Sequence, residues 1–317
     1  MLIIKNGRVV DPASQLDAQR DILIAEGKIA AVDKKIEKPG AEIFDASKLV
    51  VAPGFIDLHV HLREPGKESA ETIASGTQAA AAGGFTAVAC MPNTQPVNDN
   101  PLITRYILRQ AEVANCVRVY PIGAATKDSA GEQLAEIESM RAAGIVAVSD
   151  DGQPIWNSRV LRRVMEYCLA LDIPVIDHPE DPQLSAGGVM HEGEWSIHLG
   201  LRGIPGVAED VAVGRDLQLA ALTGARLHLA HLSTAAALAL VRRAKQQGAQ
   251  TGHTARMSGE TPVRLDGRPP VRVTCEVTPH HFTLTHAAVQ TYDTRFKMKP
   301  PLRTEEDVAA LLEGLAD

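Results

Sequence analysis

A parallel α/β barrel is the fold class that this 317-residue sequence predicts, on three observations. From Gly54 onward, apolar strand-like runs alternate with amphipathic helical stretches. The strand-like runs are apolar on both faces, which is typical of a parallel sheet covered by helices. Seven such runs follow one another and no GxGxxG motif follows the first. A TIM-type (β/α)8 barrel is therefore favoured over a doubly wound sheet.

The first fifty or so residues predict a different unit, a small β-sheet without a long helix. Short β-prone pieces are separated by turns such as the one at Asn6-Gly7. These pieces are residues 2–4, 7–10, 21–25, 28–32 and 42–45. A Pro-Gly pair then marks the change of pattern. We therefore place a small β-sheet unit, of the composite β-sandwich kind, at residues 1–53 and an incomplete barrel at residues 54–317.

Within the barrel, each predicted strand is a short apolar run and each predicted helix carries apolar residues at helical spacing. The strands are residues 55–61, 86–91, 118–122, 145–149, 174–178, 226–231 and 271–277. The helices between them include residues 70–82, 134–143, 158–171, 208–222 and 235–247. This order of elements is the one that a β/α barrel requires.

An eighth strand is the element that the predicted barrel lacks. A last helix is predicted at residues 304–315, and the sequence stops at Asp317, where the next strand is due. A barrel without its closing strand has two unpaired sheet edges, so we expect the sequence to be C-terminally truncated. An insertion at about residues 250–270, rich in Gly, Thr, Arg and Pro, precedes the seventh strand. A surface elaboration and a functional lid are both open interpretations of it.

Composition excludes several classes of function. The formal net charge is −7 and the isoelectric point is about 5.9, so nucleic acid and anionic membranes are not expected partners. No apolar stretch approaches the roughly 20 residues of a membrane span. The four cysteines are widely spaced and form no CxxC pair, which favours reduced thiols. We expect a soluble, cytoplasmic protein.

The most informative motif is the pair His59 and His61 at the end of the first barrel strand. Side chains on a strand alternate between its two faces, so these two imidazoles point the same way. An apolar run leads into them, which places them where a buried strand ends. Two imidazoles on one rigid face form half of a metal site.

Three further positions place candidate ligands at strand ends, where functional groups of a parallel barrel collect. Asp151 follows the fourth predicted strand, His178 ends the fifth, and His231 ends the sixth. Together with His59 and His61 they form the nitrogen and oxygen ligand set that zinc prefers. These residues therefore predict a site for one or two zinc ions.

Of the remaining histidines, none of which receives a ligand role, three lie on or directly after a predicted strand. His228 lies on the strand face opposite His231 by strict alternation, so we expect it to pack against a helix. For His280 and His281, which follow the seventh strand, a role in ordering the site and plain packing are both open.

Several motifs extend this pattern to a known family. They read GFIDLHVHLREPG, MPNT, SDDG, HPED, HLS, TPHH and PPLR. Together they closely resemble bacterial dihydroorotases of the longer, class I type, which belong to the amidohydrolase superfamily. The resemblance runs from Met1 to Asp317 apart from the inserted segment.

The resemblance implies a role for each candidate ligand. His59 and His61 would bind one zinc ion, and His178 and His231 a second, with Asp151 as the bridge between the ions. Zinc would activate a water molecule for ring opening and polarise the amide carbonyl under attack.

The resemblance also implies a substrate and a reaction. Arg63 would hold the substrate carboxylate, a role that suits its bidentate guanidinium group, and Asn93 would hydrogen-bond the same substrate. The implied reaction is the reversible cyclisation of N-carbamoyl-L-aspartate to L-dihydroorotate in pyrimidine synthesis. A homodimer and a complex with aspartate transcarbamoylase are the assemblies that the family suggests.

This sequence departs from the family pattern in two places. The family's catalytic aspartate ends strand eight, so we expect it beyond Asp317 and expect no catalytic carboxylate in this chain. Asp293, Glu305 and Glu306 fall on a loop or a helix start and are not substitutes. Lys299 stands before PPLR where the family usually has a substrate-contacting Asn, and could bind a carboxylate or spoil the fit.

Two alternatives remain beside the dihydroorotase interpretation. Hydantoinases and allantoinases typically bridge two metals with a carboxylated lysine at the end of strand four, whereas this sequence has Asp150 and Asp151 there. A non-catalytic subunit that scaffolds aspartate transcarbamoylase is the second alternative. Inactive relatives tend to lose the metal histidines, and this sequence keeps all four, which favours an enzyme.

Overall fold

The computed structural model describes residues 1–251 and 271–317, so the insertion predicted at about residues 250–270 lies almost wholly outside the described residues. The chain divides into two compact units. The first comprises Met1–Ile56 with Gly84–Thr86, and the second comprises Asp57–Gly83 with Ala87–Asp317. No helix in the described ranges is long and apolar enough to cross a membrane.

The first unit is a small sheet, as predicted. Its strands are β1 (Leu2–Asp11), β2 (Leu16–Ala25), β3 (Lys28–Asp33), β4 (Glu42–Asp45) and β5 (Val50–Val51). The sheet order is β3-β2-β1-β4, and β5 also pairs with β1. β1 and β2 form an antiparallel pair with an irregularity between Ile4 and Gly7, whereas β4 and β5 run parallel to β1. Ile3, Val9 and Ile22 are its buried apolar side chains on these strands.

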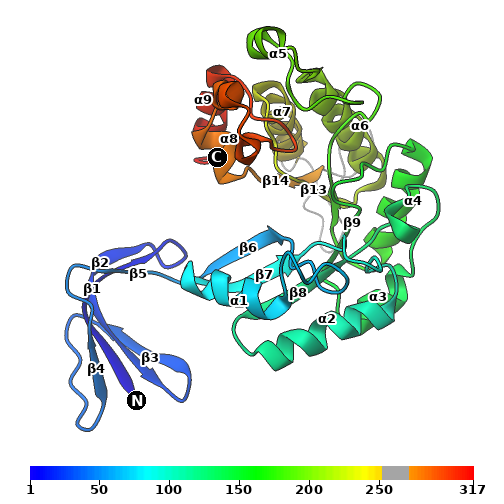
Figure 1. Cartoon of the computed structure of the whole chain (residues 1–317). Coiled ribbons are helices and arrows are strands. Elements are labelled where there is room, and N and C mark those ends of the chain that lie inside the picture. The colour runs from blue at the N-terminus through cyan, green and yellow to red at the C-terminus, as the bar shows by residue number, and fades with distance from the viewer. Residues whose placement is uncertain (252–270) are drawn as a thin grey trace. The chain divides into compact units, whose positions relative to one another are not determined.

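A seven-stranded sheet lies mainly in the second unit, which confirms the barrel-type α/β fold. Its order is β14-β13-β10-β9-β8-β7-β6, so neighbours in the sheet follow one another along the chain. The strands are β6 (Phe55–Val60), β7 (Phe85–Cys90), β8 (Arg118–Gly123), β9 (Ala147–Ser149), β10 (Val175–Asp177), β13 (Arg226–Leu229) and β14 (Arg272–Cys275). The pairs from β7 to β14 are parallel, and the sheet curls as part of a barrel (Figure 1). Its outermost strands are β6 and β14.

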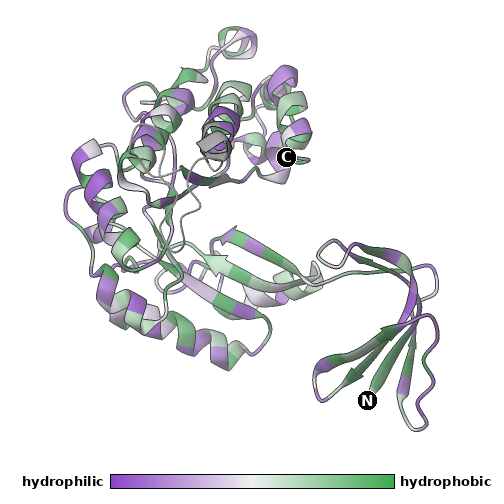
Figure 2. Ribbon diagram, turned by 180° about the vertical axis from the view of Figure 1, so that it is seen from behind, coloured by the Kyte–Doolittle hydropathy of each residue, from purple (hydrophilic) through white to green (hydrophobic). Residues whose placement is uncertain are grey.

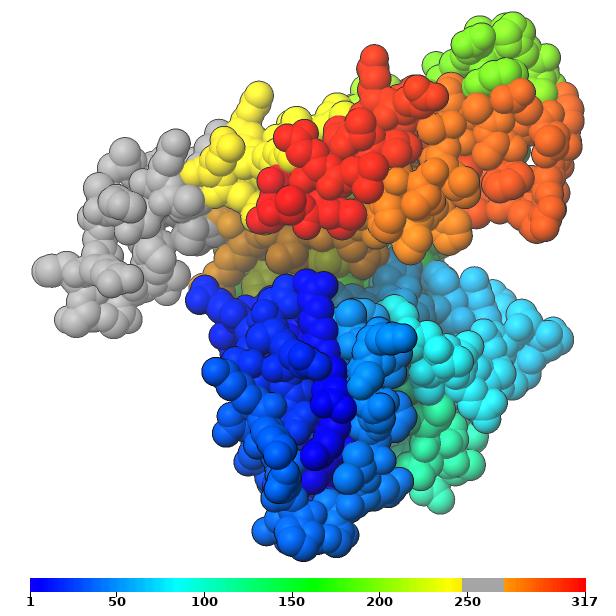
Figure 3. Space-filling model, turned by 90° about the vertical axis from the view of Figure 1, so that its left-hand side faces the viewer, coloured from blue at the N-terminus to red at the C-terminus, as the bar shows by residue number. Residues whose placement is uncertain are grey.

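Helices connect successive strands. The main ones are α1 (Ile73–Ala82), α2 (Pro101–Ala114), α3 (Ile137–Ala143), α4 (Ser158–Ala170), α6 (Val207–Thr223), α7 (Ala235–Thr251) and α9 (Glu305–Gly314). Shorter elements are α5 (Glu194–Leu199), α8 (Pro279–Thr283) and the pair β11 (Met190–His191) and β12 (Gly203–Ile204). Figure 2 shows both hydrophilic and hydrophobic residues along these helices, as expected of helices with one buried and one solvent-exposed face. At the molecular surface, α9 (red) lies beside α7 (yellow) in Figure 3.

Local sequence explains where these helices begin. The side chain of Asn100 accepts a hydrogen bond from the backbone N–H of Leu102 at the start of α2, with Pro101 in the first turn. Thr304 and Asp307 form a capping box at the start of α9. Such caps satisfy backbone N–H groups that have no partner within the helix.

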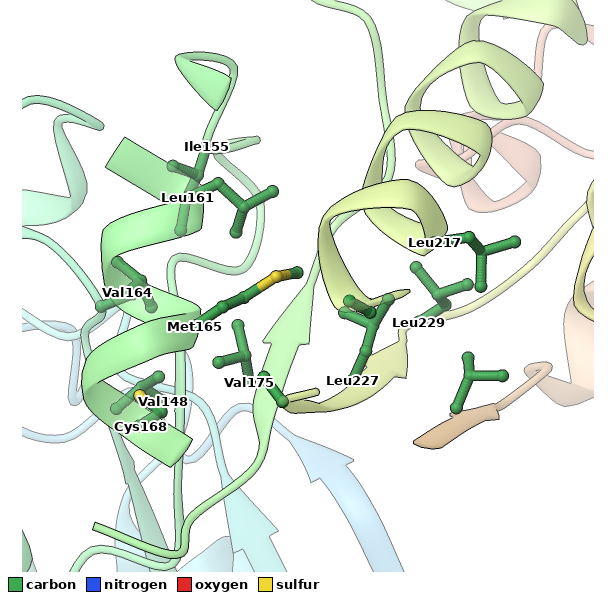
Figure 4. Packing of buried hydrophobic residues seen from close by; sticks show 14 of the residues in the cluster. Val148, Ile155, Leu161, Val164, Met165, Cys168, Val175, Leu217, Leu227 and Leu229 are labelled. Carbon is green, nitrogen blue, oxygen red and sulfur yellow. The ribbon is translucent and has the colours of Figure 1, made fainter. Parts of the chain in front are cut away.

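The largest apolar core lies between the sheet and the helices α4 and α6 (Figure 4). Leu161 and Met165 of α4 meet Val175 of β10, and Leu217 of α6 packs near Leu229 of β13. Burial of each such side chain contributes about 1.5–3 kcal/mol. This packing holds the carboxyl ends of β9, β10 and β13 in fixed positions, and these ends carry the candidate ligands.

Candidate metal centre

His59 and His61 lie together at the carboxyl end of β6. Their ring centroids are 5.2 Å apart, and Nε2 of each faces the carboxylate of Asp151, at 3.4 Å and 3.6 Å. Nδ1 of His61 is 3.0 Å from Oδ1 of Asn93. Since an amide oxygen only accepts hydrogen bonds, this contact places the His61 proton on Nδ1 and leaves Nε2 free as a ligand atom.

Asp151 is the common neighbour of all four histidines. Its Oδ1 lies 3.7 Å from Nδ1 of His178 and 3.4 Å from Nε2 of His231. The side chains of these three residues are buried. The ligand atoms of two triads each lie within 4.8 Å of one another: His59, His61 and Asp151, and Asp151, His178 and His231. Tertiary structure thus brings together all five ligands predicted from the sequence.

The polar atoms of this cluster fit a cation. Oδ1 of Asp151 is buried without a hydrogen-bond partner, and Nδ1 of His178 and Nε2 of His231 lie 2.8 Å apart. A buried carboxylate oxygen surrounded by imidazole nitrogens is the usual setting for a divalent metal. A bound metal would satisfy these atoms at once, because each offers a lone pair.

The electrostatics of Asp151 and His231 agree with this interpretation. Burial acts to raise the pKa of the Asp151 carboxyl, but the neighbouring imidazole rings of His178, His231 and His59 hold it well below its usual range. Burial, together with repulsion from His178, lowers the pKa of His231 to about 4. Asp151 is therefore ionised and His231 neutral near pH 7, which are the forms that bind metals.

The predicted substrate residues occupy the same rim. Arg63 follows His61 by two residues in a left-handed conformation (φ 60°), and its charge contributes to a lowered pKa of His61 that burial chiefly causes. Asn93 contacts His61 as described. Nζ of Lys299 lies 3.3 Å from Oε1 of Glu180, so this lysine pairs with a carboxylate of the protein itself.

Two carboxylates that lie in the site, those of Glu276 and Glu180, were given no role from the sequence. Oε1 of Glu276 is 2.5 Å from Nδ1 of His59, and Oε2 of Glu180 is 3.8 Å from Nε2 of His178. Glu180 also accepts a hydrogen bond from the Ser185 hydroxyl. A signal for Glu276 was present, because polar and apolar residues alternate along its strand, from Arg272 to Glu276.

The prediction for His228 was wrong. Its Nδ1 lies 2.8 Å from Oγ1 of Thr274 and its Nε2 lies 3.2 Å from Oε2 of Glu276, so it faces side chains of the neighbouring strand and not a helix. The error has a local cause. His231 lies beyond the end of β13 and has φ 35°, so the alternation of the strand does not continue to it.

His281 contacts two segments near the candidate site. It is buried, its Nδ1 lies 2.7 Å from Oγ1 of Thr278, and its Nε2 lies 2.9 Å from the carbonyl oxygen of Pro300. The ring therefore ties the turn after β14 to the segment that carries Lys299. No comparable contact involves His280 within the described residues.

Fold and site together define a class, the proteins built on a curled β/α sheet with a candidate metal centre at the carboxyl ends of its strands. Among solved structures, the chain is similar to L-hydantoinase (dihydropyrimidinase) from Arthrobacter aurescens, with a TM-score of 0.77 and 22% identity over 99% of this chain and 66% of that one. D-hydantoinase from Bacillus sp. AR9 gives a TM-score of 0.73 at 22% identity, over 99% of this chain and 66% of that one. At this identity the likeness is one of fold.

The comparison of sequences is more specific. A family model described as dihydro-orotase-like matches residues 47–237. The dihydroorotase of Solibacter usitatus is 54% identical over 99% of this chain and 68% of its own length. That of Syntrophotalea carbinolica is 51% identical over 100% of this chain and 69% of its own length. The chain belongs to the dihydroorotase family, which confirms the resemblance seen in its motifs, and it spans about two thirds of the length of these relatives.

Proposed function

We propose that this protein is a zinc-dependent dihydroorotase, which interconverts N-carbamoyl-L-aspartate and L-dihydroorotate in pyrimidine synthesis. The observation that carries the proposal is the position of Asp151, whose carboxylate lies 3.4–3.7 Å from one nitrogen of each of four histidines. Relatives of about 50% identity along the whole chain bear the name dihydroorotase, which supports the same substrate class.

In this proposal, His59 and His61 would hold one zinc ion, His178 and His231 would hold a second, and Asp151 would contribute its carboxylate to the same centre. When bound, zinc supplies Lewis acidity that polarises an amide carbonyl and lowers the pKa of water. The donor set supports zinc because it combines imidazole nitrogens with one carboxylate.

Arg63 and Asn93 would bind the substrate. Oδ1 of Asn93 faces Nδ1 of His61, which leaves the Asn93 amide N–H groups free to donate to a substrate oxygen. The Arg63 guanidinium suits bidentate binding of the substrate carboxylate. Lys299 is the weaker candidate for this task, because its ammonium group already pairs with Glu180.

Neither Glu180 nor Glu276 is placed to move a proton during ring opening. Glu180 faces Lys299, Ser185 and His178, and Glu276 faces His59. A proton shuttle must exchange its proton freely with the reacting atoms. Two carboxylates that are held by such partners are better suited to orienting the site.

The same proposal includes a cytoplasmic location and two assemblies, a homodimer and a complex with aspartate transcarbamoylase. The described cysteines Cys90, Cys116, Cys168 and Cys275 are all free thiols, which suits a reducing compartment. Retention of the complete ligand set favours catalysis over a purely scaffolding role.

The test is hydrolysis of L-dihydroorotate by the purified, zinc-loaded protein, followed by loss of ultraviolet absorbance, with hydantoin as the competing substrate. Zinc-dependent loss of dihydroorotate without turnover of hydantoin supports the proposal. Turnover of hydantoin instead would favour the hydantoinase alternative. Zinc binding without turnover of either substrate would match the expected absence of a catalytic carboxylate and would leave the scaffold alternative in front.

A matched pair of variants tests the substrate contact. Arg63→Met removes charge-assisted hydrogen bonds worth about 1.5–3 kcal/mol, so kcat/KM for dihydroorotate should fall roughly 10- to 150-fold. Arg109→Met removes an exposed arginine on α2 and should leave kcat/KM unchanged. An equal effect of both substitutions would contradict the role given to Arg63.

A further inference from the structure

Glu276 makes contacts with the candidate ligands of both triads. Its Oε1 lies 2.5 Å from Nδ1 of His59 and accepts a 3.3 Å hydrogen bond from the backbone N–H of His231. Its other oxygen, Oε2, lies 3.2 Å from Nε2 of His228. The carboxylate is therefore held on both oxygens and cannot swing away without loss of these contacts.

The contact with His59 joins residues that are 217 positions apart. His59 lies on β6 and Glu276 directly follows β14, and these are the two outermost strands of the sheet. No backbone pairing joins β6 to β14 in the described ranges. The side chain of Glu276 therefore links the carboxyl ends of β6 and β14, which no backbone hydrogen bonds join in the described ranges.

The backbone of Glu276 positions the second triad as well. Its N–H donates to the carbonyl oxygen of Leu229, at 3.1 Å, and its carbonyl accepts from the N–H of Leu232, at 2.9 Å. These bonds bracket the turn in which His231 adopts φ 35°. One residue thus fixes the backbone of His231 and the ring of His59.

The chemistry of the His59 contact selects a metal-binding tautomer. An ionised carboxylate only accepts hydrogen bonds, so the His59 proton nearest to Glu276 lies on Nδ1. Nε2 of His59, which faces Asp151 at 3.4 Å, is then the atom that gives its lone pair to a metal. Carboxylates that accept from the second nitrogen of a ligand histidine fix the ring and raise its basicity.

We propose that Glu276 is the positioning residue of the metal centre, which orients His59 through its ring and His231 through its backbone. His228 and Thr274 hold the second oxygen of Glu276 in place, since His228 bonds to both. This inference rests on the proposed metal-binding function and adds a residue to it.

The test compares the zinc affinity of the metal-free wild-type protein with that of three variants, by competition with a chromophoric chelator. Glu276→Gln keeps the size of the side chain but removes its charge, and should weaken zinc binding about 10- to 100-fold. Glu276→Asp keeps the charge but is one methylene shorter, and should recover part of this loss. Glu306→Gln changes an exposed glutamate on α9 and should leave the affinity unchanged.

Cobalt provides a second readout, because the visible spectrum of bound Co²⁺ reports the geometry of its ligands. The spectrum of the Glu276→Gln variant should differ from that of the wild type, and the Glu276→Asp spectrum should lie closer to the wild type. Thermal unfolding of each metal-free variant shows whether the fold is kept, so that a loss of affinity is not mistaken for unfolding.

The outcomes separate this inference from the proposed function. Wild-type protein that binds no zinc would overturn the metal centre and the role of Glu276 with it. Wild-type protein that binds zinc, with Glu276→Gln within twofold of it, would overturn the positioning role alone. A lowered unfolding temperature with unchanged zinc affinity would show a merely structural residue and would also overturn the inference.

Discussion

Replacement of Arg303 by methionine should destabilise the second unit strongly, because Arg303 is a buried cation beside a buried carboxylate. Its guanidinium is 2% exposed and lies 3.9 Å from Oε2 of Glu209, which is 3% exposed. Nε donates to the Ser233 hydroxyl at 2.9 Å, and an Nη1 hydrogen bond of 3.0 Å reaches the carbonyl of Ile204. Methionine is of similar length but provides none of these contacts.

The magnitude follows from the geometry. Two unit charges 3.9 Å apart attract by about 4 kcal/mol at an effective dielectric constant near 20. The Ile204 carbonyl would also lose a charged donor, at a cost of about 1–3 kcal/mol. Removal of the costly burial of the guanidinium offsets part of this loss. The net cost of breaking such a pair is about 3–5 kcal/mol, or roughly 6–20 °C in the unfolding temperature.

The loss of stability caused by Arg303→Met should also depend on pH. Burial raises the pKa of the Glu209 carboxyl, while Arg303 and Ser233 act to lower it. Without Arg303 this pKa rises further above its unfolded value, so the folded variant takes up a proton as the pH falls. Protonation removes the unpaired charge. The stability difference from the wild type should therefore be largest near pH 8 and shrink towards pH 5.

Urea unfolding monitored by circular dichroism, at several pH values, measures both effects. The double variant Arg303→Met with Glu209→Gln should recover part of the loss, because no unpaired charge remains. Arg109→Met, at the exposed surface, should leave the midpoint unchanged. A loss below about 1 kcal/mol for Arg303→Met, or a loss independent of pH, would refute the reasoning.

Three further predictions concern the centre, the thiols and the core. Asp151→Asn should weaken zinc binding at least roughly 100-fold in the chelator assay, since it removes the carboxylate shared by both triads; unchanged affinity would contradict the assignment. Burial raises the pKa of the Cys90 and Cys168 thiols to about 12, so a thiol reagent at pH 8 should label exposed Cys116 quickly and these two only after unfolding. Met165→Ala should lower the free energy of unfolding by about 2–5 kcal/mol in urea titrations, and a loss below about 1 kcal/mol would mean that the core collapses around the gap.

Most of the fold, and the side chains that the structure brings together as candidate ligands, could be predicted from local patterns. Apolar runs that alternate with amphipathic helices predicted the parallel sheet, and its strands follow one another in the observed order. Because side chains alternate between the two faces of a strand, His59 and His61 at the end of β6 were predicted to point the same way, and both face Asp151. These predictions succeeded because they depend on strand geometry and on where a strand ends, which a sequence records directly.

The contacts of Lys299 could not be predicted in this way. Its pairing with Glu180 joins two loops that follow different strands, and the sequence alone left open whether the lysine would meet a carboxylate or disturb the site. His281 was similarly open, because its partner is the carbonyl of Pro300, 19 residues further along the chain. Such contacts depend on the path of the chain between the elements.

The sequence by itself determined the class of fold, the order of the strands and the identity of the five candidate ligands. Only the tertiary structure decided that Glu276, after β14, contacts His59 on β6. It also decided that His228 faces Glu276 and not a helix. The physical reason is that alternation is a property of a single strand and ends with it. Distances between side chains on different strands depend instead on how the whole sheet curls, which the packing of its helices sets.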